Sequence, residues 1–179
     1  MAQDHDHPHD HAAPCAHAHA RTAALPEALA QAEAACAERG VRLTPIRRAV
    51  LEALFASHAP MGAYEILDAL NAAGAEGGPG ESKAGRGLAP IAVYRALEFL
   101  IEQGFAHKLT SRNAFTACPH MHAPHELVAF LICDACGGVD ELSTKPLAEA
   151  IGAMLARERF APRQQVLEIA GTCAHCRGG

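Results

Sequence analysis

The sequence predicts an α+β protein, with a helical domain that ends in a β-hairpin and a second, smaller α+β domain. Three observations support this fold class. Helical apolar periodicity fills the first half of the chain, two short β-type runs follow it, and strands alternate with a helix after Cys118. With 179 residues the chain has room for two small domains and a tail, which excludes a large multidomain enzyme.

The N-terminal segment differs from the rest of the chain. Residues 1–25 are rich in His and Ala and contain Pro8 and Pro14, with no apolar period. Such a composition buries too little apolar surface to fold, so we expect a disordered, His-rich tail over these residues. A tract without fixed geometry can hold metal weakly but makes a poor metal sensor.

Two helices are predicted next. Residues 26–39 place apolar side chains at helical spacing, and Gly40 follows as a helix stop. The second helix begins at Pro45, because Thr44 is a good N-cap and proline suits the first helical position. Residues 58–60 end this helix. Its apolar stripe is formed by Ile46, Val50, Leu51, Leu54 and Phe55.

Two further helices flank a glycine-rich stretch. Residues 63–72 form the third helix, and the glycines that follow over residues 74–87 indicate a flexible loop insertion. Pro90 starts the fourth helix, which extends to Gln103, and Gly104 closes it.

A β-hairpin is predicted directly after these helices. Residues 105–109 and 114–117 are short strands separated by residues 111–113. Helices followed by a hairpin give the element order of a winged helix, a helix-turn-helix variant that reads DNA. We therefore assign residues 26–117 to a winged-helix DNA-binding domain.

The chain after Cys118 forms a second unit. We expect a hinge with metal-binding residues over 118–126, then a domain over 127–179. Within that domain the sequence predicts strands at 127–132, 139–142 and 165–170 and a helix at 146–159. A core of this size usually needs a staple or a partner chain.

Two C-x-x-C pairs provide the strongest chemical signal. Cys133 and Cys136 follow one predicted strand, and Cys173 and Cys176 follow another. Four thiolates in closed tetrahedral geometry are typical of a structural Zn²⁺ site, and each two-residue spacer lets one pair reach one ion. Two unrelated surface pairs, or two redox motifs, are the less favoured interpretation, because redox motifs seldom occur in twos.

A second cluster lies around the domain junction. It comprises His107 on the hairpin, Cys118 after it, a connector histidine, and Glu141 on a later strand. Taken singly, each residue is more typical of an ordinary surface position. Together they predict an interdomain metal site, and thiolate with imidazole and one carboxylate suits tetrahedral Zn²⁺ better than Mn²⁺ or Fe²⁺.

The net charge of −5 argues at first against a nucleic-acid partner, but residues 39–112 carry more basic than acidic residues. Within this segment Tyr64 and Arg95 lie near the starts of two adjacent helices. Arg95 could contact guanine or phosphate, and Tyr64 a thymine methyl or the backbone. Tyr94 and Arg47 are further candidates for DNA contact, with packing and ordinary solvation as the alternatives.

The sequence places the protein in the cytoplasm. No apolar run approaches the ~20 residues that span a bilayer, and the N-terminus is acidic where a signal peptide is basic and then apolar. The seven Cys cannot all pair, which favours metal ligation or burial over disulfides.

Six motifs in order give the chain its resemblance to the ferric uptake regulator family, and within it most closely to the zinc uptake regulators. The resemblance covers roughly residues 26–177. The motifs are VRLTPIR at 41–47, AYEIL at 63–67, VYRAL at 93–97, QGFAHK at 103–108, ICDACG at 132–137 and CAHC at 173–176.

The resemblance implies a homodimeric repressor, with the residues after 126 forming a dimerisation domain. It implies that Tyr64 and Arg95 contact operator DNA and that the four paired Cys hold structural zinc. It also implies a regulatory zinc bound by His107, Cys118, Glu141 and a connector histidine. We favour His125 as that histidine. His122 and His120 are alternatives, because His125 lies one residue further from Cys133 than the family spacing. Ala92, where the family commonly has Thr or Ser, and the insertion at 74–87 are further departures.

These observations predict a zinc-sensing repressor of zinc-uptake genes. We expect two Zn²⁺ per chain, a palindromic duplex operator and a homodimer, and neither a membrane nor any small-molecule substrate besides the metal ion. Three alternatives remain: a sensor of iron, manganese, nickel or peroxide in the same family, a zinc buffer or metallochaperone without DNA binding, and a zinc hydrolase. The hydrolase is least favoured because the second site has no open position for water, so we expect no enzymatic activity.

Overall fold

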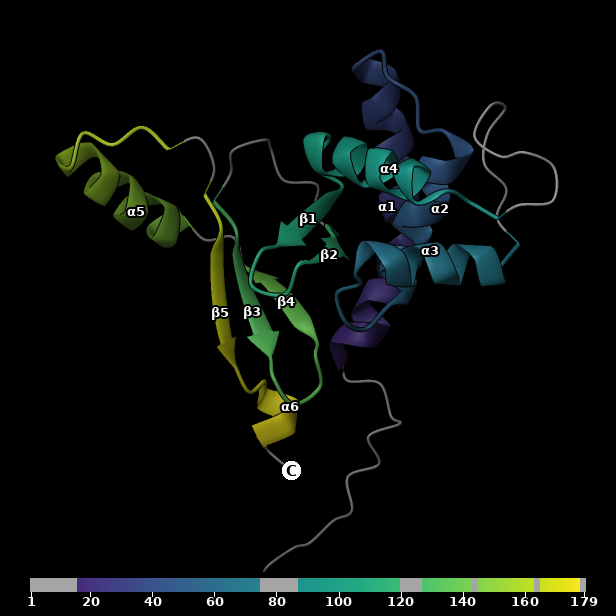
Figure 1. Cartoon of the computed structure of the whole chain (residues 1–179). Helices are drawn as coiled ribbons and strands as arrows, with labels where there is room; N and C mark the ends of the chain where they lie inside the picture. The colour runs from purple at the N-terminus through teal and green to yellow at the C-terminus, as the bar shows by residue number, and fades with distance from the viewer. Residues whose placement is uncertain (1–15, 75–86, 120–126, 143–144, 163–164, 178–179) are drawn as a thin grey trace, which may run out of the picture.

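The computed structural model describes residues 16–74, 87–119, 127–142, 145–162 and 165–177 (Figure 1). The first helix, α1 (Ala16–Glu38), begins ten residues before the predicted start and continues through Pro26. The prediction of a disordered tail to residue 25 is therefore corrected for residues 16–25. Alanine favours the helix strongly there, and a proline that suits a helix start was mistaken for one. Residues 1–15 lie outside the described part.

The other helices of the first domain confirm the prediction. They are α2 (Pro45–Ala56), α3 (Ala63–Ala72) and α4 (Pro90–Glu102). Glu65 accepts a hydrogen bond from the Gly62 backbone N–H at 2.6 Å and so caps the start of α3. Apolar faces of all four helices share one core, whose most buried members include Val50, Leu51, Ile66, Val93, Leu97, Leu100 and Phe105. The predicted loop insertion falls largely on residues 75–86, outside the described part.

A hairpin completes the first domain. Strands β1 (Ala106–Leu109) and β2 (Ala114–Ala117) pair antiparallel, with Leu109 opposite Ala114. The hairpin turns at residues 110–113, where Asn113 adopts a positive φ of 47°. We call the hairpin the wing and residues 110–113 the wing turn. Helices followed by this hairpin confirm the predicted winged helix.

The second domain is a three-stranded sheet with one crossing helix. Strands β3 (Ala129–Cys133), β4 (Val139–Leu142) and β5 (Leu167–Gly171) lie in the order β4-β3-β5. The β3–β4 pair is antiparallel and the β3–β5 pair is parallel. Helix α5 (Lys145–Arg157) leads from β4 to β5, and the short helix α6 (Ala174–Arg177), which the sequence did not predict, follows β5. This arrangement confirms the α+β fold class.

The two faces of this sheet differ in environment. On the inner face Phe130 is buried and packs in a small core with Leu109 of the wing, so the wing lies against the sheet. On the outer face Leu131 and Ile169 are exposed. Figure 1 shows that the wing lies between the helical domain and the sheet.

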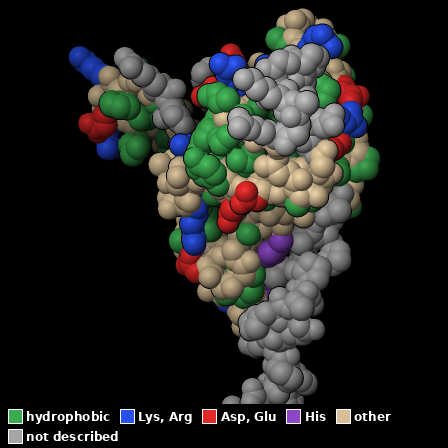
Figure 2. Space-filling model, turned by 45° about the vertical axis from the view of Figure 1, so that its right-hand side comes forward, with side chains coloured by type: hydrophobic (Ala, Val, Ile, Leu, Met, Phe, Trp, Pro, Cys, Tyr) green, Lys and Arg blue, Asp and Glu red, His purple; other side chains and the backbone are tan. Residues whose placement is uncertain are grey.

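Helix α5 stands away from the rest of the chain (Figure 1), and none of its residues is buried. Figure 2 shows hydrophobic side chains exposed on the lobe that projects at the upper left. Met154 of α5 and Phe160 just after it are 47% and 63% exposed. Apolar surface of this kind marks a contact face for another protein chain. Among the described helices, none is long and apolar enough to cross a membrane.

Candidate metal centres and DNA-facing surface

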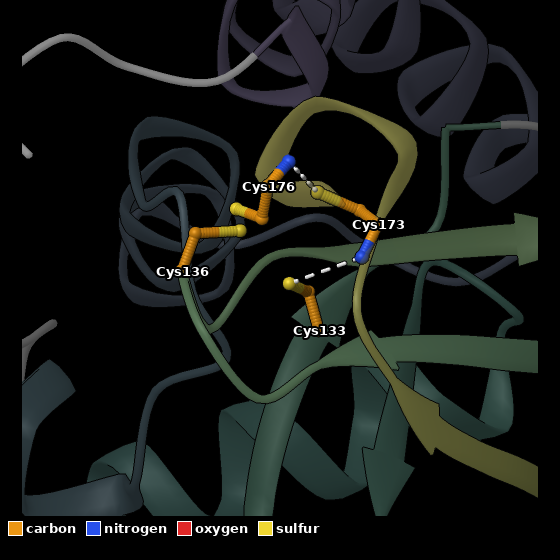
Figure 3. A group of neighbouring side chains, drawn as sticks. All are labelled: Cys133, Cys136, Cys173 and Cys176. Carbon is orange, nitrogen blue, oxygen red and sulfur yellow. Dashed lines mark hydrogen bonds between the residues drawn. The ribbon is translucent and has the colours of Figure 1, made fainter. Parts of the chain in front are cut away.

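The four paired cysteines converge at one end of the sheet (Figure 3). Cys133 ends β3 and Cys136 lies in the turn that follows, while Cys173 follows β5 and Cys176 lies on α6. All four sulfur atoms lie within 4.8 Å of one another. Gly137, with a φ of 73°, turns the backbone back toward β4 immediately after Cys136.

Backbone N–H groups polarise this cluster. The Cys173 N–H donates to the Cys133 sulfur at 3.3 Å, and the Cys176 N–H donates to the Cys173 sulfur at 3.4 Å. The Cys173 N–H, followed by that of Cys136, lowers the pKa of the Cys133 thiol to about 6. Hydrogen bonding with Cys173, burial and the neighbouring sulfurs raise the pKa of the Cys176 thiol. Negative charge is therefore favoured on Cys133 over Cys176.

The cluster fits a tetrahedral metal ion. Zn–S bonds of about 2.3 Å in tetrahedral geometry place sulfurs about 3.8 Å apart, which is within the 4.8 Å limit on the sulfur separations of this cluster. Four sulfur donors with no carboxylate among them favour zinc over Mg²⁺, Ca²⁺ or Mn²⁺. A metal ion here would join the end of β3 to the end of the chain.

A second group of donors joins the two domains. The donor atoms of His107 on β1, Cys118 after β2 and Glu141 on β4 lie within 4.8 Å of one another. The Cys118 thiol donates to Glu141 Oε1 at 3.4 Å, and His107 Nε2 lies 3.7 Å from Glu141 Oε2. His125 and the alternatives His120 and His122 fall on residues 120–126, outside the described part. Three of the four predicted ligands are therefore brought together.

The surroundings of this group suit a cation. The Glu141 side chain is only 5% exposed, and burying a carboxylate is costly unless positive charge or hydrogen bonds compensate. The His107 ring packs on Phe130 with centroids 5.0 Å apart, which fixes its orientation. Thiol, imidazole and carboxylate donors with few other oxygens fit zinc.

Three of the four predicted DNA contacts, Tyr64, Tyr94 and Arg95, are exposed on α3 and α4. Tyr64, in the first turn of α3, is 63% exposed, and Tyr94 of α4 is 41% exposed. Their rings meet edge to face at 6.5 Å. Arg95 is also exposed on α4. The starts of α3 and α4 thus present two phenols and one guanidinium together.

Arg47 is placed differently. Its guanidinium stacks on the Phe99 ring at 3.5 Å and donates to the Arg42 carbonyl oxygen at 2.6 Å. The stacking joins α2 to α4, and the hydrogen bond joins α2 to the loop before it. Its neighbour Arg48 pairs with Glu33 and Glu52, so it too is engaged within the domain.

One residue that the sequence analysis did not single out joins the two domains. Glu168 on β5 reaches the wing turn of the other domain. Its signal in the sequence is an acidic residue among the apolar residues of a strand, which does not reveal the partner.

No family model matches the chain, but individual relatives do. The zinc uptake regulation protein of Escherichia coli (strain K12) is 41% identical over 150 residues, which cover 84% of this chain and 81% of that protein. The peroxide operon regulator of Bacillus subtilis (strain 168) is 31% identical over 144 residues, which cover 78% of this chain and 86% of that protein.

A solved structure agrees with these relatives. A zinc uptake regulator complexed with zinc and DNA superposes with a TM-score of 0.74 at 38% identity, covering 86% of this chain and 95% of that one. The relatives are regulators by name, which confirms the expectation of a regulator rather than an enzyme. On this sequence and structural similarity, the chain belongs to the ferric uptake regulator family, among the zinc uptake regulators.

Proposed function

We propose that this protein is a zinc-sensing transcriptional repressor that, as a zinc-loaded dimer, binds a palindromic operator of zinc-uptake genes in the cytoplasm. One observation carries the proposal. Donor atoms from the wing (His107), from the end of the DNA-binding domain (Cys118) and from the second domain (Glu141) meet within 4.8 Å. Metal occupancy at such a site depends on how the two domains are oriented, so it can control DNA binding.

The two clusters serve different purposes in this proposal. Cys133, Cys136, Cys173 and Cys176 provide a closed set of four donors, which is typical of a structural zinc. His107, Cys118 and Glu141, completed by His125, provide the regulatory site. When bound there, zinc supplies a cation shared by both domains. The chain's own part is to place a soft sulfur and an imidazole beside a buried carboxylate, which selects zinc over Mn²⁺.

DNA recognition falls to the exposed starts of α3 and α4. Arg95 would donate to guanine or phosphate, and Tyr64 would contact a thymine methyl or the backbone. Tyr94 packs edge to face against Tyr64 and extends the same surface. Arg47, at the start of α2, is positioned mainly by Phe99 and offers at most a backbone contact from there.

A dimer follows from the second domain. The outer sheet face carries exposed Leu131 and Ile169, and α5 adds exposed apolar side chains. Covering this surface with a second copy would create a two-fold axis. Two winged helices related by such an axis match the half-sites of a palindrome, which explains the expected operator symmetry.

The energy required is modest. A coupling of about 1 to 3 kcal/mol between metal and DNA sites changes DNA affinity roughly 5- to 150-fold. Holding the two winged helices at the spacing of successive major grooves is enough to supply this coupling free energy. A cation beside Cys118 and Glu141 also reduces negative potential near the DNA-binding domain, so binding should depend on salt.

The test uses duplex fragments and the metal-stripped chain. The protein is incubated with the fragments at buffered concentrations of free Zn²⁺, Fe²⁺ or Mn²⁺, and the fragments that stay bound to it are sequenced. Enrichment of one palindrome with zinc alone is expected, and Arg95→Ala should reduce it. Enrichment with iron or manganese would overturn the metal assignment. No enrichment with any metal would overturn the regulator proposal and favour a zinc buffer.

A further inference from the structure

The wing turn is held by the other domain through Glu168 of β5. Glu168 Oε1 accepts a hydrogen bond from the Thr110 N–H at 2.7 Å, and Oε2 accepts one from the Ser111 N–H at 3.1 Å. The Ser111 hydroxyl also donates to Oε2. Successive backbone N–H groups in a turn form a concave site for an anion. Here a carboxylate from the second domain occupies it.

The sheet register explains why Glu168 reaches this turn. Phe130 lies opposite Glu141 in the β3–β4 ladder and opposite Glu168 in the β3–β5 ladder. Residues in one cross-strand row point to the same face, so all three side chains project toward the wing. Glu141 contacts His107 and Cys118, Phe130 packs on His107, and Glu168 holds the wing turn. The three side chains of this row therefore contact the wing along its length, from His107 and Cys118 to the wing turn.

Two more contacts join the wing to the second domain. Leu109 joins the apolar core of the second domain with Phe130. Arg112 of the wing turn pairs with Asp134 at 2.5 Å, although both side chains are about half exposed, so this pair contributes little stability. Three residues of the wing turn therefore face the second domain.

Glu168 is suited to hold these donors as an anion. Burial opposes ionisation, but the Ser111 hydroxyl and the backbone N–H groups of Thr110 and Ser111 lower the pKa of Glu168. The carboxylate is therefore charged at neutral pH. Charge-assisted hydrogen bonds are stronger than neutral ones, and the three of them converge on a single side chain.

We infer that Glu168 is a positioning residue that fixes the winged helix on the second domain, and that the wing turn contacts this domain rather than DNA. This inference rests on the proposed function. A metal site at one end of the wing leaves the domain free to swing about that point. A second attachment at the wing turn removes this freedom, so metal binding and the Glu168 contact favour the same orientation.

The first variant to test is Glu168→Ala in the full-length dimer. We expect about tenfold weaker operator binding by the zinc-loaded protein, within the range of ordinary allosteric coupling. Zinc affinity at the regulatory site should fall severalfold, because the competent orientation is less populated. Ser111→Ala removes one donor and leaves the backbone intact, so it should show a smaller change in the same direction. Glu38→Ala, which removes an exposed carboxylate from α1, is the matched control.

Hydrogen exchange reads the contact directly and without DNA. The amides of Thr110 and Ser111 should exchange faster in Glu168→Ala and unchanged in the control, while zinc content at the four Cys stays the same. Unchanged exchange would overturn the contact. Faster exchange with unaltered operator and regulatory zinc affinities would overturn the positioning role.

Arg112→Ala tests the second half of the inference. A phosphate contact would lower the salt dependence of DNA binding by about one unit of slope when removed. We expect the slope to stay unchanged, and a reduced slope would overturn the assignment of the wing turn. Should the wild-type protein show no zinc-dependent operator binding, the proposed function fails, while exchange and zinc affinity still decide whether Glu168 positions the wing.

Discussion

Replacing Cys176 with serine should remove the structural metal and destabilise the second domain. A metal bound by all four Cys closes a loop of roughly 40 residues between Cys136 and Cys173, and a crosslink of that length stabilises the fold by about 4 kcal/mol. The core of this domain is small, with Phe130 and Ile132 among its buried side chains. About 4 kcal/mol is a large share of the 5 to 15 kcal/mol that stabilises a typical domain.

Urea unfolding of wild type and Cys176→Ser, followed by far-UV circular dichroism, measures this loss. The zinc-to-protein ratio after gel filtration gives the metal content in parallel. Cys36→Ala is the control, because Cys36 is buried in the helical core and lies outside both metal clusters. It should cost roughly 1 kcal/mol and leave the zinc content unchanged. A Cys176→Ser protein with the wild-type midpoint and full zinc content would refute the structural role.

Three further predictions concern the other sites. Arg95→Ala should weaken operator binding by about 1 to 3 kcal/mol in anisotropy titrations, with an unchanged melting temperature because the side chain is exposed. Arg47→Ala should lower the free energy of unfolding by about 1 to 3 kcal/mol, since it loses the stacking on Phe99 and a charged hydrogen bond, and the salt dependence of DNA binding should fall by at most about one unit of slope. Glu141→Gln should lower the affinity for one of the two zinc ions by roughly 10-fold or more in chelator competition. Glu149→Gln on α5 should leave the affinity for both zinc ions unchanged.

Local chemistry explains which elements the sequence predicted well. Thr44-Pro45 marked the start of α2, and the two C-x-x-C pairs identified four Cys that the structure brings together. Each of these signals lies within a few residues of the feature it predicts. The prediction for the start of α1 was wrong for a related reason. Pro26 is a local helix-start signal, but the helix begins earlier and continues through it.

Features that depend on long-range pairing could not be predicted. Glu168 faces the wing only because β5 pairs parallel with β3 in a register that sets it opposite Phe130. A shift of one residue would turn Glu168 to the outer face, and no short motif encodes that choice. The stacking of Arg47 on Phe99 could not be predicted either, because it joins positions far apart in the chain.

Strand β5 is synthesised after the winged helix, and this order matters for regulation. The strand holds the residue that grips the wing, and Cys173 follows its last residue, Gly171, by two positions. During synthesis the helices of the winged-helix domain are therefore complete well before Glu168 is available to fix the orientation of that domain on the second one. A product truncated before β5 would keep the winged helix and the donors His107, Cys118 and Glu141, but it would lack Glu168 and half of the Cys cluster. Metal binding would then no longer fix the orientation of the winged helix.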